Sequence, residues 1–73
     1  MRDHLIQEIG QIEQHIARGD IAIGRAQNSI TLMERLGLDS SASRAAVESS
    51  NALQEARFAL RRSLLSKWYA PRP

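Results

Sequence analysis

Apolar residues recur at a strict helical spacing through the first half of the chain. Isoleucine stands at every seventh position from residue 9 to residue 30, and a second apolar row lies between these isoleucines. Together the two rows, called here the isoleucine seam, comprise Leu5, Ile9, Ile12, Ile16, Gly19, Ile23, Ala26, Ile30 and Met33. Alternating steps of three and four residues place all of them on one side of a helix. The pattern predicts a first helix over about residues 4–36, with Asp3 or His4 at its start.

A turn is predicted at residues 37–40, where the seam ends. Gly37 can adopt the left-handed backbone conformation that closes a helix, and Leu38 can then pack back onto Met33, as in a Schellman motif. So short a link favours antiparallel neighbours, and therefore an αα-hairpin.

The second helix is predicted over residues 41–68, followed by a tail at residues 69–73 that contains both prolines. Ser40 is the favoured N-cap of this helix, and Asp39 and Ser41 are the alternatives. Small residues form one face of it: Ala42, Ala45, Ala46, Ser49, Ala52, Leu53, Ala56, Ala59, Leu60, Ser63 and Leu64. Set against the isoleucine seam, such a face allows a close approach, near the lower end of the usual interaxial distance of about 8–10 Å. The small-residue face is therefore predicted to be the inner face of the second helix.

Apolar residues outside these two faces indicate a second contact surface. On the first helix, small residues repeat every seven positions beside the seam, and such a strip offers a groove to another helix. The alternative is that its glycines are merely tolerated or kink the helix. The candidate interaction surface comprises Gly10, Ala17, Gly24, Val47, Phe58, Leu65 and Trp68. These features predict an all-α, coiled-coil-like antiparallel two-helix hairpin that assembles as a homodimeric four-helix bundle.

Length and composition favour the same arrangement. The chain has 73 residues, enough for a single domain of residues 1–73, and no cysteine. A lone core of this size rarely supplies more than about 3–5 kcal/mol, and without disulfides or thiolate metal sites oligomerisation is the expected additional source. No apolar run approaches the roughly 18 residues of a membrane span, and the N-terminus lacks the apolar core of a signal peptide. We therefore expect a soluble, cytoplasmic protein without a transmembrane segment.

Positive charge gathers toward the C-terminus. Residues 1–56 contain five basic and eight acidic residues, whereas residues 57–73 contain five basic residues and no acidic one. The candidate basic patch comprises Arg57, Arg61, Arg62 and Lys67. Beside Trp68 and Tyr69, these cations could bind nucleic acid, an acidic protein or a membrane surface. The helix dipole alone also favours cations in the last turns of a helix, and this structural explanation is preferred.

The sequence contains no pattern typical of catalysis or cofactor binding. His4, Glu8, Gln11 and His15 fall on one side of the first helix, but only adjacent pairs could reach one metal ion. A solvated face is the expected role of this row, with a polar contact in a dimer interface as the alternative for His15. The serines lack His and Asp partners at a recognisable spacing, and the glycines form no phosphate loop. We expect no enzyme, no metal and no cofactor.

One set of residues resembles a known pattern. It comprises His15-Ile16-Ala17-x-Gly19, then Ile23 and Ile30, and finally Gly37-x-Asp39-Ser40. The set resembles short bacterial helical-hairpin proteins of unknown function, whose pattern opens with His-Ile-Ala-x-Gly and closes the first helix with Gly-x-Asp-Thr. The resemblance implies a helical hairpin and no particular activity. This chain departs from the pattern at Ile21, Ala22 and Ala26, where those proteins tend to have polar residues.

Two hypotheses for the function follow from these features. The first is a non-catalytic helical interaction module that self-associates and binds another protein in a regulatory or signalling role. The alternative is a small nucleic-acid-binding protein that uses the basic C-terminal end of the second helix.

Overall fold

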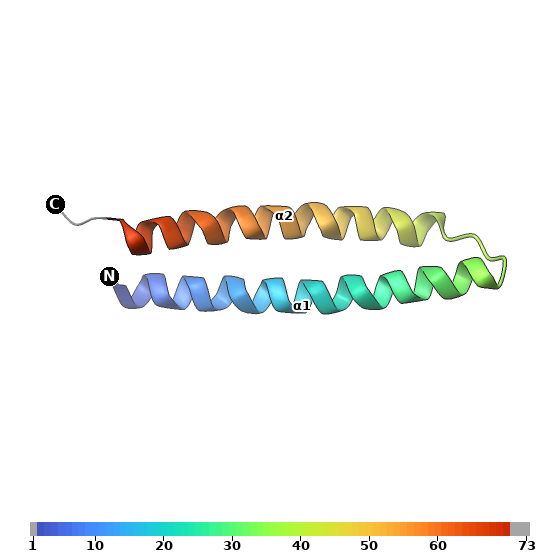
Figure 1. The fold of residues 1–73 in the computed structure, drawn as a ribbon, viewed down its shortest axis with the longest axis horizontal. Helices are drawn as coiled ribbons and strands as arrows, with labels where there is room; N and C mark the ends of the chain where they lie inside the picture. The colour runs from blue at the N-terminus through green and yellow to red at the C-terminus, as the bar shows by residue number, and fades with distance from the viewer. Residues whose placement is uncertain (1, 71–73) are drawn as a thin grey trace.

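Two antiparallel helices make up the whole of the described structure (Figure 1). The computed structural model describes residues 2–70, with α1 at Arg2–Arg35 and α2 at Ser41–Tyr69. The hairpin measures 61 × 15 × 13 Å, and the start of α1 and the end of α2 lie side by side. The predicted all-α hairpin is confirmed. The helix bounds agree with the predicted ones within two residues, and most of the predicted tail lies outside the described residues.

The isoleucine seam faces α2, as predicted. All nine seam residues are buried or half-buried, whereas most other α1 residues are exposed. Ile12 and Ile16 form the core with Leu64 of α2, and Phe58 packs against this cluster. Asp3 does not cap α1, because the helix already begins at Arg2; its carboxylate lies in the first turn, where the helix dipole favours negative charge.

The predicted turn is present in detail. Gly37 has a φ of 72°, a left-handed conformation that glycine adopts without the steric cost of a Cβ atom. The backbone N–H of Leu38 donates to the carbonyl oxygen of Met33 at 2.8 Å, and that of Gly37 donates to Glu34 at 3.1 Å. These two hydrogen bonds define a Schellman motif, so the predicted helix ending is confirmed, whereas the side chain of Leu38 is 56% exposed.

Ser40 occupies the N-cap position of α2, as predicted, but the preceding residue Asp39 accepts the capping hydrogen bonds. Ser40 precedes the helix but makes no capping hydrogen bond; its hydroxyl oxygen accepts from Nε of Arg44 at 3.1 Å instead. The Asp39 carboxylate accepts from the backbone N–H of Ser41 at 2.9 Å and from the Ser41 hydroxyl. Both hydrogen bonds favour the ionised form, and they lower the pKa of Asp39 below its ordinary value.

This cap predicts a pH-dependent loss of stability in the variant Asp39→Asn. Because the folded-state pKa of Asp39 is lowered, its contribution to stability is present at neutral pH and disappears as the pH falls through that pKa. We therefore expect a lower thermal midpoint for Asp39→Asn at pH 7, and a difference from the parent protein that shrinks toward pH 2. Circular dichroism during heating measures this. Glu55→Gln removes an exposed charge within α2 and serves as the control; an equal effect there would contradict the capping role.

The inner face predicted for α2 is wrong. Of the eleven small and apolar residues assigned to it, Leu64 alone is buried, and the other ten are exposed. The residues that face α1 are instead the buried Val47, Gln54 and Leu64, with Ser43, Arg57, Phe58, Arg61, Leu65 and Trp68 half-buried. Large side chains gain more from burial than alanines do, and this difference decides which side of α2 turns inward. The small-residue face consequently lies on the outside of the hairpin.

Candidate functional site

The candidate interaction surface is divided by the fold. Gly10, Ala17 and Gly24 lie along the outer flank of α1, and a Cβ atom added at either glycine would meet nothing within 4 Å. Val47, however, is buried in the hairpin, and Phe58 packs against its core. Leu65 and Trp68 are half-buried as well. The prediction of an outer surface is therefore wrong for Val47 and Phe58, which pack between the two helices, and it stays a prediction for Leu65 and Trp68.

The candidate basic patch is not one surface either. Nη1 of Arg57 donates to the carbonyl oxygen of His15 at 3.4 Å, so this side chain reaches across to α1. Nη1 of Arg61 lies 3.5 Å from Oε1 of Glu13, and its guanidinium carbon lies 5.1 Å from the centre of the Phe58 ring. Both arginines thus reach across to α1.

Arg62 and Lys67 are the exposed members of the basic patch. They are five positions apart, and at about 100° per residue their side chains point roughly 140° apart around α2. Affinity for nucleic acid rises with the number of phosphates neutralised at once. The fold therefore gives the nucleic-acid hypothesis no support.

A polar network that the sequence patterns did not predict crosses the middle of the hairpin. The side chain of Gln54 is only 4% exposed, and its Nε2 donates to the carbonyl oxygen of Ile16 at 2.7 Å and to Oδ1 of Asp20 at 2.9 Å. Nη1 of Arg57 donates to Oε1 of Gln54 at 2.9 Å. A buried polar group satisfied in this way fixes the register of two helices, because sliding either helix would leave it unpaired.

Gly19 makes room for this network. A Cβ atom added there would lie 2.4 Å from Oε1 of Gln54 and 2.6 Å from Nη1 of Arg57. The signal in the sequence was the position of Gly19 itself, since a glycine interrupts a seam otherwise filled mainly by large apolar residues. A gap of this kind requires a partner side chain from the other helix.

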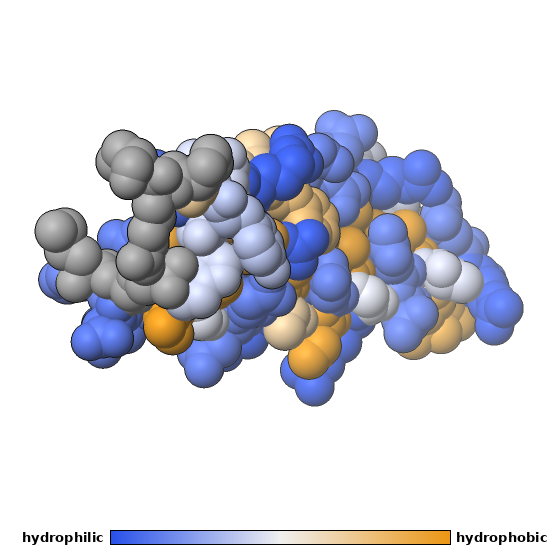
Figure 2. All heavy atoms as spheres, turned by 60° about the vertical axis from the view of Figure 1, so that its left-hand side comes forward, coloured by the Kyte–Doolittle hydropathy of each residue, from blue (hydrophilic) through white to orange (hydrophobic). Residues whose placement is uncertain are grey.

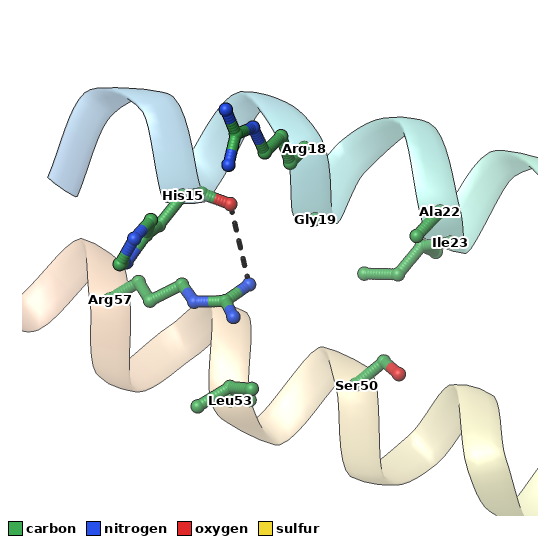
Figure 3. A pocket seen from close by; sticks show the side chains of 8 residues that line it. All are labelled: His15, Arg18, Gly19, Ala22, Ile23, Ser50, Leu53 and Arg57. Atoms are coloured by element: carbon green, nitrogen blue, oxygen red, sulfur yellow. Dashed lines mark hydrogen bonds between the residues drawn. The ribbon is translucent and has the colours of Figure 1, made fainter. Parts of the chain in front are cut away.

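A surface cavity of about 350 Å³ opens beside the network (Figure 3). Both helices line it with His15, Arg18, Gly19, Ala22, Ile23, Ser50, Leu53 and Arg57. Small residues on the two facing helices leave the space, Ile23 and Leu53 supply apolar walls, and the two arginines supply positive charge. No residue of this lining is acidic.

The metal-binding types of side chain are dispersed over the described part of the chain. Within residues 2–70, no group of three or more His, Cys, Asp or Glu side chains is placed to hold a metal ion. His4, Glu8 and Gln11 are exposed along α1, as is His15. Over the same residues, neither helix has the length and apolarity that a membrane span requires.

The fold and these sites define a two-helix hairpin with a buried polar layer. Comparison of the chain with protein-family models, with curated proteins and with solved structures finds no match. The resemblance to short bacterial helical-hairpin proteins therefore stays a hypothesis.

Proposed function

We propose that this chain is a non-catalytic helical interaction module that self-associates as a homodimeric four-helix bundle and serves a protein partner in a regulatory or signalling role. The observation that carries the proposal is the exposed face of α2. Its residues, called here the outer stripe, are Ala42, Ala46, Ser49, Leu53, Ala56, Leu60 and Ser63. They follow alternating steps of four and three residues, the spacing of a helix-packing seam. Thus α2 carries two such seams, one against α1 and one uncovered.

The thin core of a single hairpin supports association. Only four apolar side chains within residues 2–70 are buried: Ile12, Ile16, Val47 and Leu64. Leu53 and Leu60 of the outer stripe are 52% and 50% exposed, and hydrophobic side chains interrupt the hydrophilic surface at several places along the hairpin (Figure 2). A small domain without disulfides commonly gains its missing apolar burial by oligomerisation.

The order of residues along the outer stripe suits a second copy of the same chain. In a symmetric dimer, the stripes of two α2 helices would run antiparallel across a twofold axis. Leu53 of one copy can then lie opposite Ala56 of the other, and Leu60 opposite Ser49. Each leucine meets a small residue in this register, so the helices can approach closely without voids. No charged residue belongs to the stripe, so no like charges face one another within it.

Sedimentation equilibrium at tens of micromolar protein tests the dimer. We expect two copies for the parent chain and one copy for the double variant Leu53→Asp with Leu60→Asp. Each copy contributes two leucines, so the variant dimer loses four leucines from its interface. At roughly 1 kcal/mol or more for each leucine, the Kd should rise by at least about a thousandfold.

Ile6→Asp is the matched control for this experiment. Ile6 has the same 52% exposure as Leu53, but it lies on α1 outside the outer stripe. We expect this variant to remain dimeric. A monomeric parent chain, or dissociation of Ile6→Asp to the same extent, would contradict the proposed interface.

A further inference from the structure

We propose that the cavity beside Gly19 binds a small organic carboxylate, with its charge at Arg57, its apolar part on Ile23 and Leu53, and Arg18 at the rim (Figure 3). The cavity is formed within one chain, so the inference does not rest on the proposed self-association. Leu53 belongs both to this lining and to the outer stripe, so the site is tested in a monomeric variant as well as in the parent chain. Its volume of about 350 Å³ suits a small molecule.

Arg57 is positioned in advance for an anion. Its Nη1 is held by the carbonyl oxygen of His15 at 3.4 Å and by Oε1 of Gln54 at 2.9 Å. Gln54 is itself buried and fixed by two further hydrogen bonds to α1. A guanidinium has five N–H donors, so the donors on Nη2 and Nε of Arg57 stay available to a ligand after these two bonds. Because the group is already ordered, a bound anion would cost little additional side-chain entropy.

Arg18 supplies a second cation at the rim of the cavity. Within residues 2–70 it makes no hydrogen bond or ion pair through its guanidinium, and it is exposed. The hydroxyl of Ser50 lies in the same lining. Arginine binds carboxylates through two parallel hydrogen bonds, and no acidic residue of the lining competes for either guanidinium.

The apolar walls select the class of anion. Ala22, Ile23 and Leu53 contribute no hydrogen-bonding side chain, so an inorganic anion would fill only the charged part of the cavity. A carboxylate that carries a short hydrocarbon chain satisfies both parts. Inorganic phosphate shares the charge but not the hydrocarbon chain, and it serves to distinguish the two kinds of ligand.

A titration of the full chain with hexanoate, monitored by two-dimensional ¹H–¹⁵N NMR, tests the site. We expect saturable shifts centred on Gly19, Ala22 and Leu53. Hexan-1-ol, phosphate and acetate each lack part of the recognised chemistry, and we expect each to bind on the order of tenfold more weakly. Equal shifts with hexan-1-ol, tighter binding of phosphate, or shifts spread evenly along both helices would overturn the proposal.

Three variants separate the site from general effects. Arg18→Gln should weaken hexanoate binding on the order of tenfold, whereas Arg25→Gln, one heptad further along the same face of α1, should leave it unchanged. Ala22→Leu should block binding with every cation retained. Equal effects of Arg18→Gln and Arg25→Gln would contradict a local site.

Leu60→Asp distinguishes this proposal from self-association. Leu60 belongs to the outer stripe but does not line the cavity. A Leu60→Asp protein that sediments as a monomer should bind hexanoate as the parent chain does. Loss of binding in that monomer would overturn a site formed within one chain, whereas normal binding by a parent chain that is itself monomeric would contradict the dimer alone.

Discussion

Ile16→Asp should abolish folding. Ile16 is only 5% exposed and packs with Ile12 and Leu64 in the core of the hairpin. Truncation of a buried isoleucine costs about 2–5 kcal/mol, and a buried, unpaired carboxylate adds to that cost. The core of a domain of this size rarely supplies more than about 3–5 kcal/mol of stability, so the substitution removes all of it. Far-ultraviolet circular dichroism should show the loss of most helical signal at 25 °C.

Ile21→Asp is the control for this prediction. It makes the same substitution on the same helix, five residues away, but Ile21 is 58% exposed. We expect the helical signal to persist and the free energy of unfolding to change by no more than about 0.5 kcal/mol. Similar destabilisation in both variants would mean that α1 does not bury the side on which Ile16 lies.

This pair of variants depends on a part of the fold that was predictable from the sequence. The isoleucine seam repeats so strictly that one side of α1 had to face a partner, and Gly37 marked the end of the helix. Ser40 occupies the predicted N-cap position, but which side chain accepts the capping hydrogen bonds depends on backbone geometry that residue types do not determine.

The orientation of α2 was not predictable by the same reasoning. Its inner face contains polar residues such as Gln54 and Arg57, and a search for apolar periodicity passes over them. The small residues and leucines of the outer stripe form the more regular pattern, and apolar periodicity alone therefore predicts that face as the inner one. Two seams compete on this helix, and the larger side chains of Val47, Leu64 and Trp68 decide which one packs against α1.

The polar network could be predicted only in part, for a related reason. Gly19 signals missing volume in the seam, but the residue that fills it depends on the register of α2. That Gln54 and Arg57 lie opposite Gly19 can be predicted only when the turn geometry and the inner face of α2 are known. The candidate carboxylate site includes Arg57 of this network, so the sequence patterns could not predict it either.

Gly19→Ala should destabilise the hairpin, although alanine is the better helix former. The propensity gain is about 1 kcal/mol. Against it, the new Cβ atom would lie 2.4 Å from Oε1 of Gln54, and the amide must leave its place. Two hydrogen bonds from Nε2 of Gln54 are then lost, one of them to the carboxylate of Asp20, at a combined cost of about 2–4 kcal/mol. The net loss of unfolding free energy is about 2 kcal/mol, measurable by urea denaturation at a fixed protein concentration.

Gly10→Ala and Gly24→Ala decide whether this loss comes from the network. A Cβ atom at either position meets nothing within 4 Å, so the helix propensity acts alone and both variants should gain about 0.5–1 kcal/mol. Combining Gly19→Ala with Gln54→Ala removes the clashing amide, and the double variant should be more stable than the sum of the two single losses predicts. Strict additivity would show that Gly19 and Gln54 act independently. If the single variant Gly19→Ala were more stable than the parent chain, the hydrogen bonds of the network would contribute less free energy than the glycine costs α1 in helix propensity.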